Sequence, residues 1–114
     1  MELLEMARNI VSIIFKERDK TILILTHDSR FRRKTLEYLV REIEHPSFKF
    51  KNVDYGSSTI KDDRGNRIFI VSANSPSELE HCRALIPNYV FLDYMVEEWM
   101  NKWEYIKMII ARKR

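Results

Sequence analysis

The sequence has little cysteine, glycine or proline, and it has no long hydrophobic run. Its 114 residues include one cysteine, two glycines and three prolines. A single cysteine, Cys82, excludes an internal disulfide and a multi-cysteine zinc site, and so little glycine and proline excludes collagen-like and low-complexity sequence. The longest apolar runs, such as residues 22–25 and 68–71, are far too short to span a bilayer. We therefore expect a core that forms without covalent or metal crosslinks.

The composition is typical of one folded domain. Hydrophobic residues make up 45% of the chain and charged residues 32%, and the length is close to the commonest domain size. We predict a single domain over residues 1–114. The first residues carry Glu2 and Glu5 instead of the basic start of a signal peptide, so the expected location is the cytoplasm, without membrane contact. A net charge of +3 permits contact with nucleic acid but does not require it.

Helical and strand-like patterns alternate along the chain. Apolar residues recur at helical spacing, or follow helix-start signals, in residues 2–17, 29–44, 76–85 and 94–111. Short apolar or alternating runs predict strands at residues 21–26, 48–53, 57–61, 67–72 and 89–92. Residues 57–61 and 67–72 flank a loop that contains Gly65, which predicts a hairpin. We therefore expect an α/β fold, a three-layer sandwich with a mostly parallel central sheet and one β-hairpin.

Candidate catalytic residues follow the predicted strands. In open α/β sheets ligands meet the carboxyl ends of the strands, and Asp28 and Asp93 stand at two such ends, with Glu97 one helical turn further on. Asp28, Asp93 and Glu97 would hold a divalent metal such as Mg²⁺ for phosphodiester hydrolysis, with Asp93 as the first ligand. The alternative is that Asp28 and Asp93 cap the helices that they precede. His27 would serve as an acid or base in such a site, or hydrogen-bond within its own turn.

Basic residues crowd the beginning of the helix predicted at 29–44. Cations at a helix N-terminus oppose the helix dipole, and a docked anion would offset that cost. Phe31 lies within this group and could stack on a base. The candidate nucleic-acid-binding residues are Arg30, Phe31, Arg32, Arg33, Lys34, Lys49, Lys51, Arg112, Lys113 and Arg114. The alternative is a solvated basic surface balanced by the acids elsewhere in the chain.

The order of segments over residues 3–99 resembles the P-loop ATPase core of phage terminase large subunits and helicases. The segments that carry the resemblance are TILILT, RFRRKTLEYLVREI, TIKDDRGNRIFIVSA, SPSELEHCRAL and YVFLD. The resemblance implies that Asp93 matches the magnesium-binding acid of that family. Two departures matter: the chain has no G-x-x-x-x-G-K-[ST] loop, and Tyr94 stands where the family places a glutamate. The loop supplies the phosphate-binding amides and lysine, so the resemblance implies a degenerate core that has lost hydrolysis.

Two classes of function remain open at this point. The first is a non-catalytic binding protein of the viral or mobile-element type, without a cofactor, that contacts nucleic acid or a nucleic-acid-processing protein. The second is a small metal-dependent nuclease or phosphotransfer enzyme that uses Asp28, Asp93 and Glu97 with Mg²⁺. The predicted C-terminal helix carries Tyr94, Trp99, Trp103 and Tyr105. These form a core-packing stripe or a surface for self-association, since aromatic residues are typical anchors of interfaces.

Overall fold

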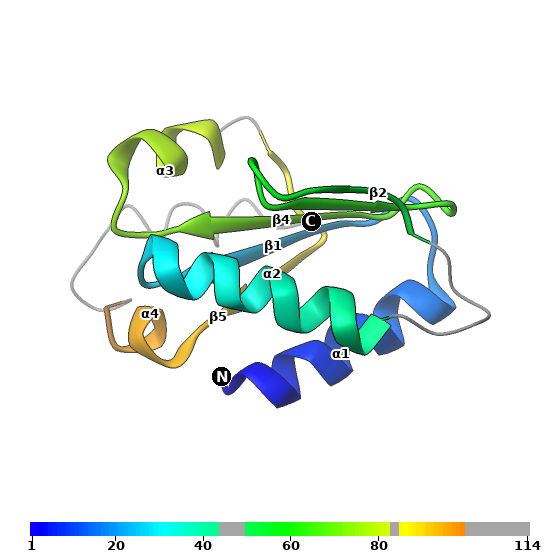
Figure 1. Cartoon of the computed structure of the whole chain (residues 1–114), viewed down its shortest axis with the longest axis horizontal. Helices are drawn as coiled ribbons and strands as arrows, with labels where there is room; N and C mark the ends of the chain where they lie inside the picture. The colour runs from blue at the N-terminus through cyan, green and yellow to red at the C-terminus, as the bar shows by residue number, and fades with distance from the viewer. Residues whose placement is uncertain (44–49, 83–84, 100–114) are drawn as a thin grey trace.

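The structure, a computed structural model, describes residues 1–43, 50–82 and 85–99 of the chain. Helices and strands alternate in these residues, as Figure 1 shows. The helices are α1 (Leu3–Lys16), α2 (Ser29–Ile43), α3 (Pro76–Cys82) and α4 (Tyr94–Trp99). The strands are β1 (Thr21–Thr26), β2 (Phe50–Asp54), β3 (Thr59–Asp62), β4 (Arg67–Ser72) and β5 (Tyr89–Leu92). The expected α/β fold is confirmed.

The five strands form one mixed sheet in the order β2-β3-β4-β1-β5. Strand β1 pairs in parallel with β4 and with β5, whereas β2–β3 and β3–β4 are antiparallel pairs. The prediction of a mostly parallel sheet is therefore wrong, because the sheet contains two antiparallel pairs beside its two parallel pairs. The physical reason is the short connection at residues 55–58, which joins β2 to β3, because a tight turn can only join antiparallel neighbours. The predicted hairpin, β3–β4, is confirmed.

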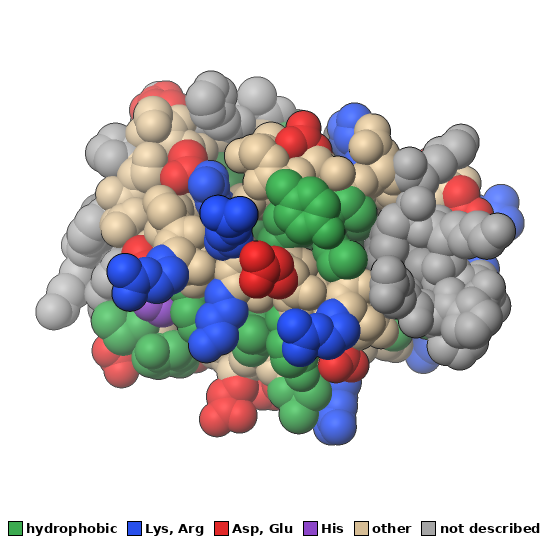
Figure 2. Space-filling view, in the orientation of Figure 1, with side chains coloured by type: hydrophobic (Ala, Val, Ile, Leu, Met, Phe, Trp, Pro, Cys, Tyr) green, Lys and Arg blue, Asp and Glu red, His purple; other side chains and the backbone are tan. Residues whose placement is uncertain are grey.

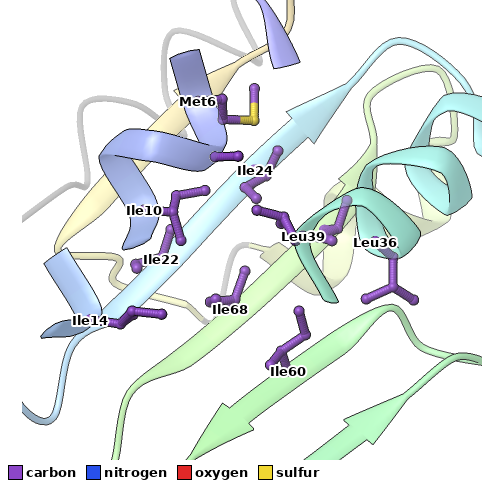
Figure 3. Close-up of a cluster of buried hydrophobic side chains, with 11 residues drawn as sticks. Met6, Ile10, Ile14, Ile22, Ile24, Leu36, Leu39, Ile60 and Ile68 are labelled. Atoms are coloured by element: carbon purple, nitrogen blue, oxygen red, sulfur yellow. The ribbon is translucent and has the colours of Figure 1, made fainter. Parts of the chain in front are cut away.

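Strand β1 is the most deeply buried element of the sheet. All six of its residues are buried, as expected for a strand between two parallel neighbours. Its side chains alternate between two hydrophobic clusters: Ile22 and Ile24 belong to one, and Leu23 and Leu25 to the other. The first cluster joins the sheet to α1 and α2, and Figure 3 shows its members between these helices and the strands.

The second cluster joins the sheet to the two short helices. Leu79 and Cys82 of α3 and Val96 of α4 pack there with Leu23 and Leu25. Helical residues therefore pack on both faces of β1, and the carboxyl ends of β1 and β5 are held close to the beginnings of α2 and α4. No helix in the described part of the chain is long and apolar enough to cross a membrane.

The β3–β4 loop lies at the opposite end of the sheet and is held by buried polar groups. The carboxylate of Asp62 accepts hydrogen bonds from the backbone N–H of Arg64 and from the backbone and side-chain nitrogens of Asn66, at 2.8–2.9 Å. Gly65 has a φ of +84°, and a Cβ there would lie 2.1 Å from Oδ1 of Asp19. Glycine is required at this position because of both its backbone conformation and the close approach.

Candidate functional site

Asp93 is a buried carboxylate at the point where β5 ends. Its side chain is 1% exposed, and a buried carboxylate is costly unless it is hydrogen-bonded. Oδ1 accepts a hydrogen bond from the backbone N–H of Val96 at 2.8 Å, which makes Asp93 the N-cap of α4. Oδ2 accepts from the backbone N–H of His27 at 2.6 Å and lies 2.7 Å from Nδ1 of the same residue. Asp93 therefore joins the end of β5, the end of β1 and the beginning of α4.

The ring of His27 lies between two carboxylates. A carboxylate only accepts hydrogen bonds, so Nδ1 carries the proton that faces Asp93. Nε2 lies 3.5 Å from Oδ2 of Asp28. Asp28 also accepts a hydrogen bond from the backbone N–H of Phe31 at 2.7 Å, so it caps α2. The capping interpretation is thus confirmed for both Asp28 and Asp93, and the two strand-end acids converge on one imidazole.

Three rings gather beside these carboxylates. The ring centroids of His27 and Phe31 are 4.7 Å apart, and that of Tyr94 lies 5.8 Å from His27 and 6.3 Å from Phe31. Both contacts of Tyr94 are edge-to-face, an arrangement that aromatic pairs favour. Tyr94 remains 51% exposed. We call His27, Phe31 and Tyr94 the aromatic group.

The predicted basic residues of α2 are not equivalent in the structure. Arg30, Arg33 and Lys34 are exposed. Their spacing of i, i+3 and i+4 places them on one side of the helix. We call Arg30, Arg33 and Lys34 the basic stripe. Figure 2 shows Lys and Arg side chains over the face that α2 covers, with an acidic side chain among them. One exposed acid of α2, Glu37, lies 3.7 Å from Nε of Arg33.

Arg32 differs from the basic stripe because it is engaged inside the molecule. Its side chain is 25% exposed, and Nη1 forms an ion pair with Oε1 of Glu78 in α3. The same oxygen lies 3.4 Å from the backbone nitrogen of Ser72. At the start of α3, the backbone N–H of Glu78 donates to Oγ of Ser75 at 3.4 Å. Its carboxylate also links α3 to the end of β4 and to α2.

A cavity of about 320 Å³ lies beside this ion pair. Its lining includes Arg32 and Glu78, together with Phe69, Leu85 and Cys82. Cys82 is 2% exposed. Burial raises the pKa of its thiol to about 11, and the nearby carboxylate of Glu78 adds to the rise. Cys82 therefore packs as a buried apolar residue of the second cluster.

Glu97, the third acid of the predicted metal site, contacts the amino group of Met1. Its Oε1 lies 2.6 Å from the amino nitrogen of Met1. Among residues 1–43, 50–82 and 85–99, no group of three or more His, Cys, Asp or Glu side chains is placed to hold a metal ion. Magnesium binding by Asp93, Asp28 and Glu97 stays a prediction.

Several residues of the predicted nucleic-acid-binding surface and of the predicted C-terminal helix lie outside the described parts of the chain. Lys49, Arg112, Lys113 and Arg114 lie beyond the described residues, as do Trp103 and Tyr105 of the predicted C-terminal helix. Lys51 lies in β2, and its side chain is not described. Self-association through the C-terminal helix therefore stays a prediction.

Two features of the site were not predicted. The Arg32–Glu78 ion pair joins residues 46 positions apart, and nothing in the local pattern distinguishes Arg32 from its neighbours. The contact of Tyr94 with Phe31 also depends on where β1 and β5 lie in the sheet. One signal was available, since both residues follow strand ends that a parallel pairing brings together.

Comparisons with protein-family models, with curated proteins and with solved structures found no match to this chain.

Proposed function

We propose that this chain is a non-catalytic module that binds nucleic acid through the basic stripe of α2. The observation that carries the proposal is the exposure of Arg30, Arg33 and Lys34 on one side of the helix, while Arg32 is paired with Glu78. Side chains at i, i+3 and i+4 are neighbours on a helix surface. A row of exposed cations suits the regularly spaced charges of a phosphate backbone.

The position of these cations supports the same proposal. The first turn of α2 contains no acidic residue, and Asp28 offsets only part of the positive end of the helix dipole through its cap. Cations in the first turns are unfavourable beside that end of the dipole. A bound polyanion would remove this repulsion, so the arrangement gains stability from the partner that we propose.

The resemblance to the P-loop ATPase core supports a role in binding without catalysis. Asp93 directly follows β5, and the resemblance matches it to the magnesium-binding acid of that family. Here the carboxylate caps α4 and holds His27, and the chain contains no phosphate-binding loop sequence. We propose a degenerate core of the viral or mobile-element type that uses its basic surface.

A titration with matched single substitutions tests the proposal. A fluorescently labelled 20-nucleotide DNA is titrated with each variant at low salt, and the dissociation constant is read from anisotropy. Arg33→Gln should weaken binding roughly three- to tenfold through the loss of one phosphate contact. Glu37→Gln should strengthen binding, because the exposed carboxylate beside Arg33 repels phosphates.

Lys61→Gln is the control for this titration. Lys61 is exposed, and it follows Ile60, which packs in the cluster with α2. Alternation along β3 places Lys61 on the opposite face of the sheet. This substitution should change the dissociation constant less than twofold. Equal losses for Arg33→Gln and Lys61→Gln, or no binding by the unmodified chain, would refute the proposal.

One observation favours a second candidate, a metal-dependent nuclease. Asp28 and Asp93 both face His27, so two strand-end carboxylates lie on either side of a group able to transfer protons. Titration of Mg²⁺ or Mn²⁺ against a labelled single-stranded substrate tests this candidate. Metal-dependent cleavage that Asp28→Asn abolishes would establish the enzyme, and intact substrate at all metal concentrations would exclude it.

A further inference from the structure

The aromatic group lies beside the basic stripe. Phe31 follows Arg30 in the first turn of α2, and its ring centroid is 6.3 Å from that of Tyr94 in α4. Figure 1 shows the beginning of α2 next to α4. Two elements that are far apart in the chain therefore bring an exposed aromatic ring to the end of a row of cations.

The ring of Tyr94 is supported on its inner side. His27 and Phe31 are only partly exposed, and both meet the ring of Tyr94 edge-to-face. His27 is itself fixed by Asp93, through Nδ1 at 2.7 Å. Since the supporting rings are held in place, Tyr94 loses little conformational freedom when a second flat group lies against it. Tyr94 is nevertheless 51% exposed.

We infer that the nucleic acid bound here is single-stranded, with one base stacked on Tyr94 while the adjacent phosphates contact the basic stripe. This inference rests on the proposed function and names its partner. Base stacking on aromatic side chains combined with a cationic track is how proteins bind single strands. In a duplex the base faces are already stacked on each other and cannot lie against Tyr94. Cations alone would bind both forms, so the exposed ring is the feature that selects the single strand.

The experiment compares one 12-nucleotide strand with its own duplex. The strand carries 2-aminopurine, a fluorescent base whose emission falls when it stacks on an aromatic ring. The unmodified chain should bind the strand at least tenfold more tightly than the duplex and should quench the 2-aminopurine. Tyr94→Ala should lose about tenfold in affinity for the strand, lose the quenching, and bind the duplex as before.

Three further variants separate stacking from other effects. Tyr94→Phe retains the ring and should retain both quenching and selectivity. Tyr94→Leu keeps an apolar contact with Phe31 but has no ring, so it should behave as Tyr94→Ala does even if the alanine variant is poorly folded. Tyr55→Ala removes another exposed tyrosine, 58% exposed in the β2–β3 turn, and should change nothing.

The outcomes distinguish this inference from the function on which it rests. Strand-selective binding that depends on a ring at position 94 supports it. Equal binding of strand and duplex, weakened by Arg33→Gln but not by Tyr94→Leu, leaves the proposed function in place and overturns the inference. If neither form binds at low salt, both are overturned.

Discussion

Asp93 accepts two hydrogen bonds from His27, one from its backbone N–H at 2.6 Å and one from Nδ1 at 2.7 Å. A third, from the N–H of Val96, occupies the other carboxylate oxygen. One carboxylate thus ties the ends of two parallel strands to the beginning of a helix. The side chain is almost completely buried. The change in the free energy of unfolding when it is replaced therefore measures its structural role, whether or not it takes part in a reaction.

Replacement of Asp93 should destabilise the fold strongly. Asp93→Ala removes the cap of α4 and leaves the N–H of His27 and of Val96 without their acceptor. Loss of the cap, which is the bond from the N–H of Val96, costs about 1 kcal/mol, and the unpaired N–H of His27 adds about 1–3 kcal/mol. We expect the free energy of unfolding, measured in urea, to fall by about 2–4 kcal/mol.

Asp28→Ala is the matched comparison for Asp93→Ala. Asp28 also caps a helix, but its side chain is 43% exposed, so water can replace the lost bonds. The expected loss is about 1 kcal/mol. A loss of stability for Asp28→Ala as large as that for Asp93→Ala would contradict the structural role assigned to Asp93.

Substitution of Arg32 should lower the stability of the fold more than substitution of Arg33. Arg32 is 25% exposed and paired with Glu78 across two helices, and its Nε is buried without a hydrogen-bond partner among the described residues. Arg33 is 78% exposed, and its side chain lies 3.7 Å from Glu37. Exposed pairs of this kind contribute little.

We therefore expect Arg32→Ala to lower the free energy of unfolding by about 1–2 kcal/mol and Arg33→Ala to change it by less than about 0.5 kcal/mol. Chemical denaturation of both variants measures this difference. The reverse order of stability would show that Arg32, and not Arg33, belongs to the surface.

Cys82 should react slowly with alkylating reagents. Only the thiolate is nucleophilic, and burial raises the thiol pKa from 9.0 to about 11. At pH 8 a shift of that size lowers the thiolate fraction about 100-fold. Alkylation by iodoacetamide, followed by mass spectrometry, should be at least that much slower in the folded chain than in urea. Similar rates in both states would contradict the buried position of this thiol.

The elements that local patterns specify could be predicted from the sequence. The apolar run at residues 22–25 predicted the strand β1, and Asp28 and Asp93 were recognisable as caps because each precedes a helical pattern. The mixed sheet was not predicted, since the strand-like pattern of residues 48–53 does not reveal the direction of that strand relative to β3. That direction follows from the turn at residues 55–58.

The candidate site was only partly predictable, because its contacts are long-range. Four basic residues near the start of α2, Arg30, Arg32, Arg33 and Lys34, look alike in the sequence. Arg32 nevertheless pairs with Glu78, while Arg33 stays exposed. Similarly, Tyr94 meets Phe31 only because β5 lies next to β1. Tertiary packing decides which side chains remain at the surface, and the local sequence pattern does not predict which ones these are.

The salt dependence of binding tests the central claim most directly. The dissociation constant for a single-stranded DNA is measured between 50 and 300 mM salt for the unmodified chain and for the variant with Arg30, Arg33 and Lys34 all changed to Gln. Each lost phosphate contact on a single strand reduces the slope of log affinity against log salt by about 0.7. We predict that the triple variant loses about two units of slope, and an unchanged slope would contradict the assignment of these three residues as the phosphate-binding surface.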